Sequence, residues 1–313
     1  MTTEPIMLHG SLPADVGTLL PTRVLRTPSL ASEYWALTKP EVNFLIAIAT
    51  LTGFYLARPG LHDFRWLALV NTLLGTLLVA SGTGTLNQYV EREFDAQMRR
   101  TSRRPLAAGR LNPSIVLFFG MALSMLGCIY LAMAVSVLAS LLATATLLSY
   151  LFLYTPLKRK TPLCILVGAF PGAVPPLIGW AAASGKVSSE AWMLYAVLFL
   201  WQFPHFMAIA WMHRDDYDRA GYLVLPRDQS RGRFVVLQTL LPLLALLPLS
   251  LFPVLIGHVS VVYCIGALLL SFGFLYYGAQ FLWHRSNASA RRLLKASIIY
   301  LPLLFVLMFL PRG

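Results

Sequence analysis

The stretch that decides the fold covers residues 66–104 and reads WLALVNTLLGTLLVASGTGTLNQYVEREFDAQMRRTSRR. Its first 25 residues, Trp66 to Val90, carry no formal charge. Such a run is long enough to cross a bilayer as a helix, which takes about 20 apolar residues. Three acids and five arginines then follow within residues 91–104. The stretch therefore predicts a membrane helix that ends in a dense cluster of charge.

The rest of the chain repeats the uncharged pattern. Only 12% of the 313 residues are charged, whereas soluble proteins carry about a quarter. Leu111–Leu157 and Phe234–His284 contain no Asp, Glu, Lys or Arg, and each is long enough for two crossings. This composition predicts an all-α, polytopic membrane protein and excludes a water-soluble globular domain.

The uncharged runs divide into about nine transmembrane helices around an intramembrane cavity. We expect a partly disordered N-terminal tail, 1–35, and one membrane domain, 36–313, with no cleavable signal visible in the tail. The expected helices are 40–57, 66–91, 113–133, 136–154, 162–182, 190–212, 234–256, 260–283 and 292–310.

The distribution of basic residues predicts the orientation. With the N-terminus in the cytoplasm, the cytoplasmic segments hold 21 of the 25 Lys and Arg residues. Basic residues gather in cytoplasmic loops of membrane proteins, so we expect this topology. The net charge of +12 then has a topological explanation, and no nucleic-acid partner is expected.

The charge cluster has a regular spacing. Asn87, Glu91 and Asp95 are four residues apart and share one helix face, while Glu93 points elsewhere. Ordinary ion pairing at a helix end would explain acids here, but polar groups within a membrane helix are costly and usually functional. We favour a site in which these oxygen donors bind a polyphosphate through a metal ion. The guanidinium groups that follow are those of Arg99, Arg100, Arg103 and Arg104.

A second acidic segment, WMHRDDYDRAGYLVLP, covers residues 211–226. Asp215 and Asp218 can share a helix face, while Asp216 projects elsewhere. One of these aspartates should face the first cluster, and the spacing does not select which. Arg219 is either an anion donor or a partner of the aspartates.

Three further features could contribute to a site. Lys158 lies in a basic run whose ordinary role is topology, and it could also add charge to an anion site. His205 lies in WQFPHF, residues 201–206, deep in an apolar run; a lone buried His is more often structural than a ligand. Residues 168–180, GAFPGAVPPLIGW, predict either a kinked, closely packed helix or a helix broken where it lines a cavity.

Together these stretches resemble a known family. The run NQYVEREFDAQMRRTSRRPL resembles the first signature of the UbiA-type intramembrane prenyltransferases. YTPLKRKTP (154–162), WQFPHF (201–206), DYDRAGYLVLP (216–226) and the Asn at position 87 are similar to the subfamily that farnesylates haem. The resemblance spans about residues 35–310, although residues 213–218 lack the regular DxxxD motif of many relatives.

The resemblance implies a Mg²⁺-dependent transfer of farnesyl from farnesyl diphosphate to a vinyl group of haem B, giving haem O. It implies a bacterial inner-membrane enzyme in contact with lipid, with haem A synthase or oxidase-assembly factors as possible partners. The expected metal-binding residues are Asn87, Glu91, Asp95, Asp215 and Asp216, and all but Asp215 are also expected to be catalytic. The expected diphosphate donors are Arg99, Arg103, Arg104, Lys158 and Arg219, with His205 on the haem side.

Three other functions compete with this one. A prenyltransferase of the same fold could act on a phenolic quinone precursor. A transporter is less favoured because the acids lie at one membrane face, and a haem chaperone would bind haem without releasing diphosphate. Turnover of an isoprenyl diphosphate by the purified protein separates enzyme from carrier.

Overall fold

The computed structural model is all-helical and describes residues 29–57, 65–229, 231–255 and 260–310. Most of the expected tail, 1–35, lies outside these residues, but α1 (Leu30–Leu37) crosses its expected boundary at residue 35. The other elements are α2 (Pro40–Ala57), α3 (Trp66–Asp95), α4 (Pro113–Ala134), α5 (Val137–Leu148), η1 (Ser149–Tyr154), α6 (Thr155–Leu157), α7 (Cys164–Gly172), α8 (Pro175–Ser184), α9 (Ser189–Met212), α10 (Arg214–Arg219), α11 (Arg231–Leu255), α12 (Val261–His284) and α13 (Asn287–Met308).

Eight spans in the described part of the chain are long and apolar enough to cross a membrane. The polytopic, all-α prediction is therefore confirmed. The expected ninth crossing corresponds to α13, which has 22 residues but carries Arg291, Arg292 and Lys295 in its first three turns. The count of nine and the cytoplasmic N-terminus remain predictions.

The fifth expected helix, 162–182, is two helices. The sequence PGAVPP interrupts it, because Pro175 and Pro176 supply no backbone donor, and the chain resumes as α8. Gly172, at the end of α7, lies so close to Gln202 of α9 that a β-carbon there would collide with the amide. Gln202 in turn donates to the Ala169 carbonyl at 3.1 Å. The break is thus both tightly packed and supported by a polar side chain.

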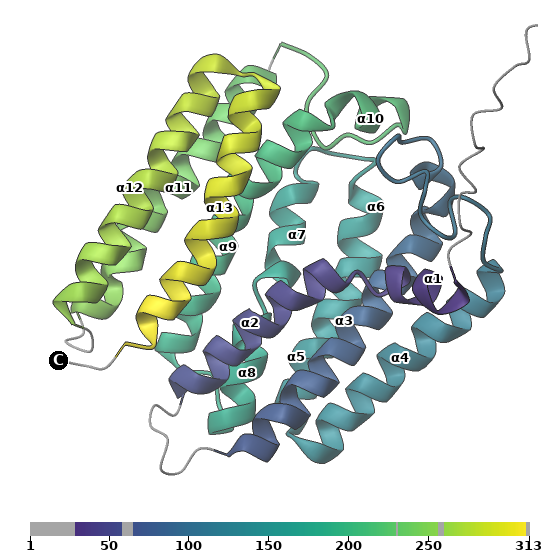
Figure 1. Cartoon of the computed structure of the whole chain (residues 1–313), viewed down its shortest axis with the longest axis horizontal. Helices are drawn as coiled ribbons and strands as arrows, with labels where there is room; N and C mark the ends of the chain where they lie inside the picture. The colour runs from purple at the N-terminus through teal and green to yellow at the C-terminus, as the bar shows by residue number, and fades with distance from the viewer. Residues whose placement is uncertain (1–28, 58–64, 230, 256–259, 311–313) are drawn as a thin grey trace, which may run out of the picture.

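The helices form a tilted bundle in which distant segments meet at one end (Figure 1). At that end, α10 lies beside the loop that follows α3. Their contact is polar: the backbone N–H groups of Arg99 and Arg100 each donate to Asp216 at 3.3 Å. We call this end of the bundle, with Asp95, Lys158 and Asp216, the site end.

Candidate functional site

The last three turns of α3 carry the Asn87–Glu91–Asp95 face into the protein. These three side chains belong to residues that are only 1%, 5% and 1% exposed. Asn87 Nδ2 donates to Glu91 Oε2 at 2.9 Å, so the amide and the first carboxylate are directly connected. Glu93, from the opposite face, is exposed and pairs with its neighbour Arg92. The predicted division of this helix into an inner and an outer acidic face is confirmed.

Each member of this face is bound by a cation. Lys39 Nζ donates to Asn87 Oδ1 at 2.5 Å, and Lys158 Nζ donates to Glu91 Oε1 at 2.8 Å. Arg104 Nη1 lies 2.6 Å from Asp95 Oδ2. Buried charges are stable only when paired and hydrogen-bonded, which this arrangement achieves. The result is a polar centre with oxygen donors on α3 and three cations around it, to be called the acid–cation cluster.

Lys158 reaches the cluster because the helix before it is irregular. α5 widens into the π-helical turn η1 and continues as α6, directly before Lys158. Such π turns frequently occur at functional sites. Here the turn places Thr155 Oγ1 at 3.5 Å from Asn87 Nδ2 and the ring of Tyr154 4.6 Å from the Lys158 ammonium.

The two lysines have opposite pKa shifts. Burial, together with the positive charges of Arg104 and Lys158, lowers the pKa of Lys39 to about 7. Burial also disfavours the charge on Lys158, but the Glu91 carboxylate outweighs it and holds the pKa of Lys158 well above its ordinary value. Lys158 is therefore protonated at neutral pH, whereas the charged form of Lys39 would be stabilised by an added negative charge.

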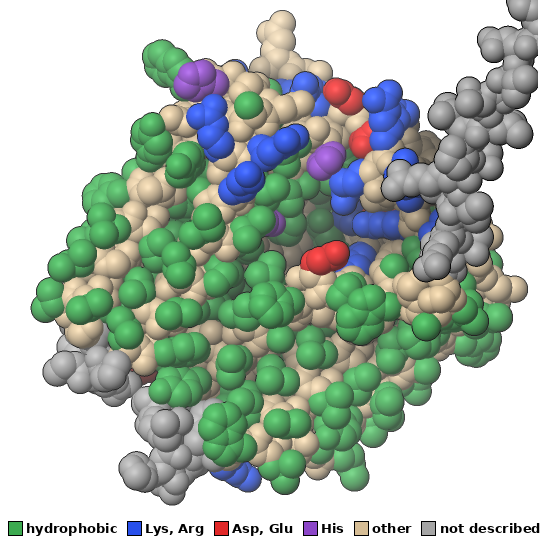
Figure 2. Space-filling model, viewed as in Figure 1, with side chains coloured by type: hydrophobic (Ala, Val, Ile, Leu, Met, Phe, Trp, Pro, Cys, Tyr) green, Lys and Arg blue, Asp and Glu red, His purple; other side chains and the backbone are tan. Residues whose placement is uncertain are grey.

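A cavity of about 410 Å³ adjoins the cluster and is strongly basic. It lies between α1, the start of α2 and the loop after α3. Figure 2 shows a hollow in this face of the molecule, with Lys and Arg side chains gathered along its rim and hydrophobic side chains on the surface below. The charged residues that line the cavity are Glu33, Lys39, Glu41, Arg100, Arg103, Arg104 and Arg110. Five cations against two acids suit an anionic ligand.

The second acidic segment is arranged differently. Asp215 is exposed and pairs with Arg214 at 3.7 Å, and Asp218 pairs with Arg227 at 3.3 Å. Only Asp216 is buried, where it accepts from the loop after α3 and from Arg219 at 3.0 Å. Burial alone would raise the pKa of Asp216, but these donors outweigh it and the pKa lies below its ordinary value.

The remaining predicted residues lie in three places. Arg99 meets Asp216 through its backbone N–H, and Arg103 lines the basic cavity. His205 faces α13, where its Nδ1 lies 2.8 Å from Ser297 Oγ. Since the Ser297 hydroxyl donates its proton to the Leu294 carbonyl at 2.6 Å, His205 Nδ1 must be the donor. The Nε2 atom of a neutral His205 then carries the free lone pair.

Two residues of the site were missed from the sequence. Lys39 precedes α2 in a left-handed backbone conformation, φ 54°, that aims its side chain at Asn87. Tyr222 has a buried hydroxyl near Glu91, and burial followed by the negative charge of Glu91 raises its pKa. A Lys-Pro pair before a membrane helix could have signalled Lys39, whereas nothing local marks Tyr222.

The oxygen donors of the Asn87–Glu91–Asp95 face can bind magnesium only if a bound ligand supplies further oxygen atoms. In the described residues, no group of three His, Cys, Asp or Glu side chains could hold a metal ion. Asn87 and Asp95 are eight residues apart, about 12 Å along a helix, so one ion cannot contact the whole face. Mg²⁺ is usually held by one or two carboxylates plus substrate phosphates. The face fits that mode.

Sequence comparison identifies relatives along nearly the whole chain. Residues 46–306 match the UbiA prenyltransferase family. A protoheme IX farnesyltransferase of Solibacter usitatus (strain Ellin6076) is 46% identical over 287 residues, which are 90% of this chain and 98% of that protein.

Solved structures share the fold at low sequence identity. A structure of digeranylgeranylglyceryl phosphate synthase superposes with a TM-score of 0.72 at 17% identity, covering 89% of this chain and 97% of that one. A UbiA homologue from Archaeoglobus fulgidus, bound to GPP and Mg²⁺, superposes with a TM-score of 0.55 at 15% identity, covering 89% and 100%. These similarities establish a common helical architecture.

Proposed function

The chain belongs to the UbiA prenyltransferase family, and we propose that it transfers farnesyl from farnesyl diphosphate to a vinyl group of haem B, forming haem O. The identity of 46% to a protoheme IX farnesyltransferase supports this acceptor. The acid–cation cluster is the observation that supports a prenyl diphosphate as the donor. It combines buried carboxylates with three cations at the mouth of a membrane bundle.

The diphosphate would bind at the acid–cation cluster. Asn87, Glu91 and Asp95 would hold Mg²⁺ by adjacent members of the face together with the diphosphate, and the bound metal neutralises charge that develops on the leaving group. The Mg²⁺ and GPP in the Archaeoglobus fulgidus homologue are consistent with this use of the fold. Lys39, Lys158 and Arg104 already surround these oxygens. They would exchange part of their present pairing for phosphate oxygens, which are stronger acceptors.

The second segment would complete the site. Asp216 and Arg219 lie against the loop that carries Arg99, so they would approach the diphosphate from the α10 side. The two backbone donors that hold Asp216 would be exchanged for bound metal or for donors on the diphosphate side. Arg99 and Arg103 would add positive charge at the rim, while the exposed Asp215 is at most an outer contributor.

The transfer begins when the bond between C1 of farnesyl and the diphosphate oxygen breaks and the electron pair leaves with diphosphate. The vinyl group of haem attacks the allylic cation, and water then adds to the new carbocation and loses a proton, leaving a hydroxyl. Preorganised cations stabilise the departing charge, and apolar helices exclude water until the carbon–carbon bond has formed. His205, neutral and with Nε2 free, would meet the haem.

The expected cellular location follows from membership of this enzyme family. The eight apolar spans and the bacterial relatives support a place in the bacterial cytoplasmic membrane, where both the prenyl chain and haem would partition from lipid. Haem A synthase or oxidase-assembly factors would receive the product.

The proposal is tested with purified protein in detergent, given farnesyl diphosphate, haem B and Mg²⁺. Mass spectrometry of the extracted pigment should detect haem O, and excess chelator should abolish it. Full turnover in chelator would refute the metal requirement. Prenylation of a phenolic acid but not of haem would identify the quinone-precursor activity instead, and haem binding without diphosphate release would identify a chaperone.

A further inference from the structure

The first three turns of α13 carry positive charge that the acid–cation cluster does not use. Arg291, Arg292 and Lys295 are all exposed, and they line a small open cavity of about 280 Å³ with Asn287 and Ala288. None of the three has an ion-pair partner among the described residues. Unpaired cations beside a depression are suited to an external anion.

The direction of these side chains follows from the helix. Asn287 lies one turn before Arg291, and its Oδ1 accepts from Arg214, the first residue of α10, at 2.8 Å. Arg291 therefore faces roughly the side of α13 on which α10 begins, and Lys295 follows one turn later. In Figure 2, basic side chains over the first turns of α13 border the hollow on the side away from the α3 loop.

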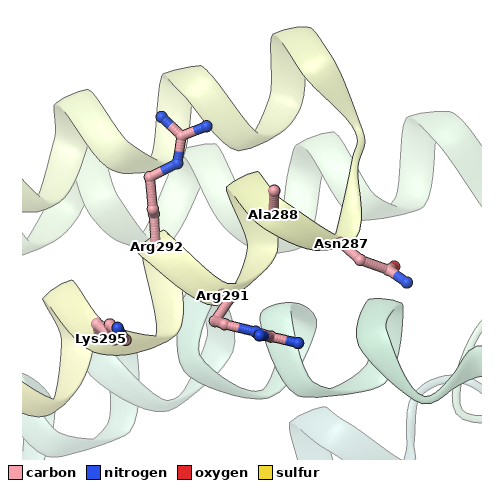
Figure 3. Close-up of a pocket in the computed structure, with 5 residues that line it drawn as sticks. All are labelled: Asn287, Ala288, Arg291, Arg292 and Lys295. Carbon is pink, nitrogen blue, oxygen red and sulfur yellow. The ribbon is translucent and has the colours of Figure 1, made fainter.

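Arg292 has a different environment. Arg292 also lines the depression, but Figure 3 shows its side chain leaving α13 in a different direction from that of Arg291. Its Nη1 donates to Gln280 Oε1 of α12 at 3.2 Å, so it is turned towards α12. It has the same charge as Arg291 and is its neighbour in the chain, so it is a control for any effect of net charge or topology.

We propose that Arg291 and Lys295 bind the two propionate carboxylates of the haem acceptor. This inference rests on the proposed function. Haem carries both propionates on one edge and its vinyl groups away from that edge. With the carboxylates fixed at the α13 rim of the hollow, the vinyl-bearing part points into the bundle, towards the diphosphate on α3.

The neighbouring contacts agree with this placement. Two residues after Lys295, Ser297 holds His205, whose ring stacks on Trp201 at 4.6 Å. Ser297 is buried whereas Lys295 is exposed, so the imidazole nitrogen lies on the bundle side of α13 and the cations on its outer side. A haem held at its propionates by the cations would extend from that outer side towards His205, whereas an anionic lipid headgroup would have no use for the imidazole.

The test measures KM for haem B, and for haem B dimethyl ester, in detergent free of anionic lipid. Wild type is compared with the double variant Arg291→Gln/Lys295→Gln and with Arg292→Gln. We expect the double variant to raise KM for haem B on the order of tenfold, since partly exposed charge pairs contribute modestly. Its kcat and its KM for farnesyl diphosphate should stay within twofold. The ester, which lacks both negative charges, should show equal KM values with wild type and the double variant.

The other outcomes separate the alternatives. The inference is overturned if the KM for haem B is unchanged in the double variant, or if Arg292→Gln raises that KM equally. The proposed function still stands in either case if the wild type forms haem O. A double variant that changes only the response to added phosphatidylglycerol identifies a lipid site and also overturns it. A wild type that farnesylates neither haem nor its ester refutes the proposed function, and this inference with it.

Discussion

The two acidic segments at the site end have similar compositions and different surroundings. On α3, Glu91 is buried and its cation, Lys158, comes from 67 residues further along the chain. On α10, Asp215 and Asp218 are exposed, and each pairs with an arginine nearby in the sequence. Only Asp216 has partners from a distant segment. Burial of the carboxylate, with donors from distant segments for Glu91 and Asp216, indicates a site, whereas exposed local pairs are ordinary surface.

If this distinction is right, Glu91→Gln should cause the largest loss. It removes the negative charge that holds Lys158, leaving that cation buried and unpaired, and it removes an oxygen donor for Mg²⁺. We expect kcat for farnesyl transfer to fall by roughly a hundredfold to a thousandfold. Glu93→Gln, on the exposed face, is the control, and steady-state haem O formation is the measurement. Equal losses in the two variants would show that the buried and the exposed acid of α3 do not differ in function.

Asp95→Asn and Asp216→Asn come next. Each should lower kcat by roughly a hundredfold while the protein still binds haem, because both carboxylates serve one leaving group. The double variant should fall well short of the product of the two losses. An Asp216→Asn variant with nearly full activity would mean that Asp216 only holds the loop at Arg99 and Arg100.

The sequence predicts most of the helices to within a few residues because membrane crossings are marked by long uncharged runs. It also predicts the α3 face, since a four-residue spacing on a helix fixes the direction of Asn87, Glu91 and Asp95. The break between α7 and α8 was one of two stated alternatives. What depends on tertiary contact could not be predicted: the choice of Asp216 over Asp215, and the approach of Lys39 and Tyr222.

Lys39→Gln should have a smaller effect, on binding. Burial and neighbouring cations lower its pKa to about 7, and the negative charge of a bound diphosphate would favour its charged form. Losing one such contact should raise KM for farnesyl diphosphate about tenfold, with kcat less affected. Initial rates over a range of farnesyl diphosphate concentrations separate the two constants. A lower kcat with unchanged KM would place Lys39 in the transition state only.

Asp215→Asn and Asp218→Asn should change least. Both side chains are substantially exposed, and exposed ion pairs contribute little. We expect rates within twofold of wild type and an unfolding midpoint that hardly moves. A hundredfold loss in Asp215→Asn would show that α10 rearranges when substrate binds.

The most direct test is a cryo-EM structure with Mg²⁺ and a non-hydrolysable farnesyl diphosphate analogue. We expect diphosphate density on the Asn87–Glu91–Asp95 face, in contact with Lys39, Lys158 and Arg104. Density among the aspartates of α10, with those three cations still bound to the α3 side chains, would contradict it.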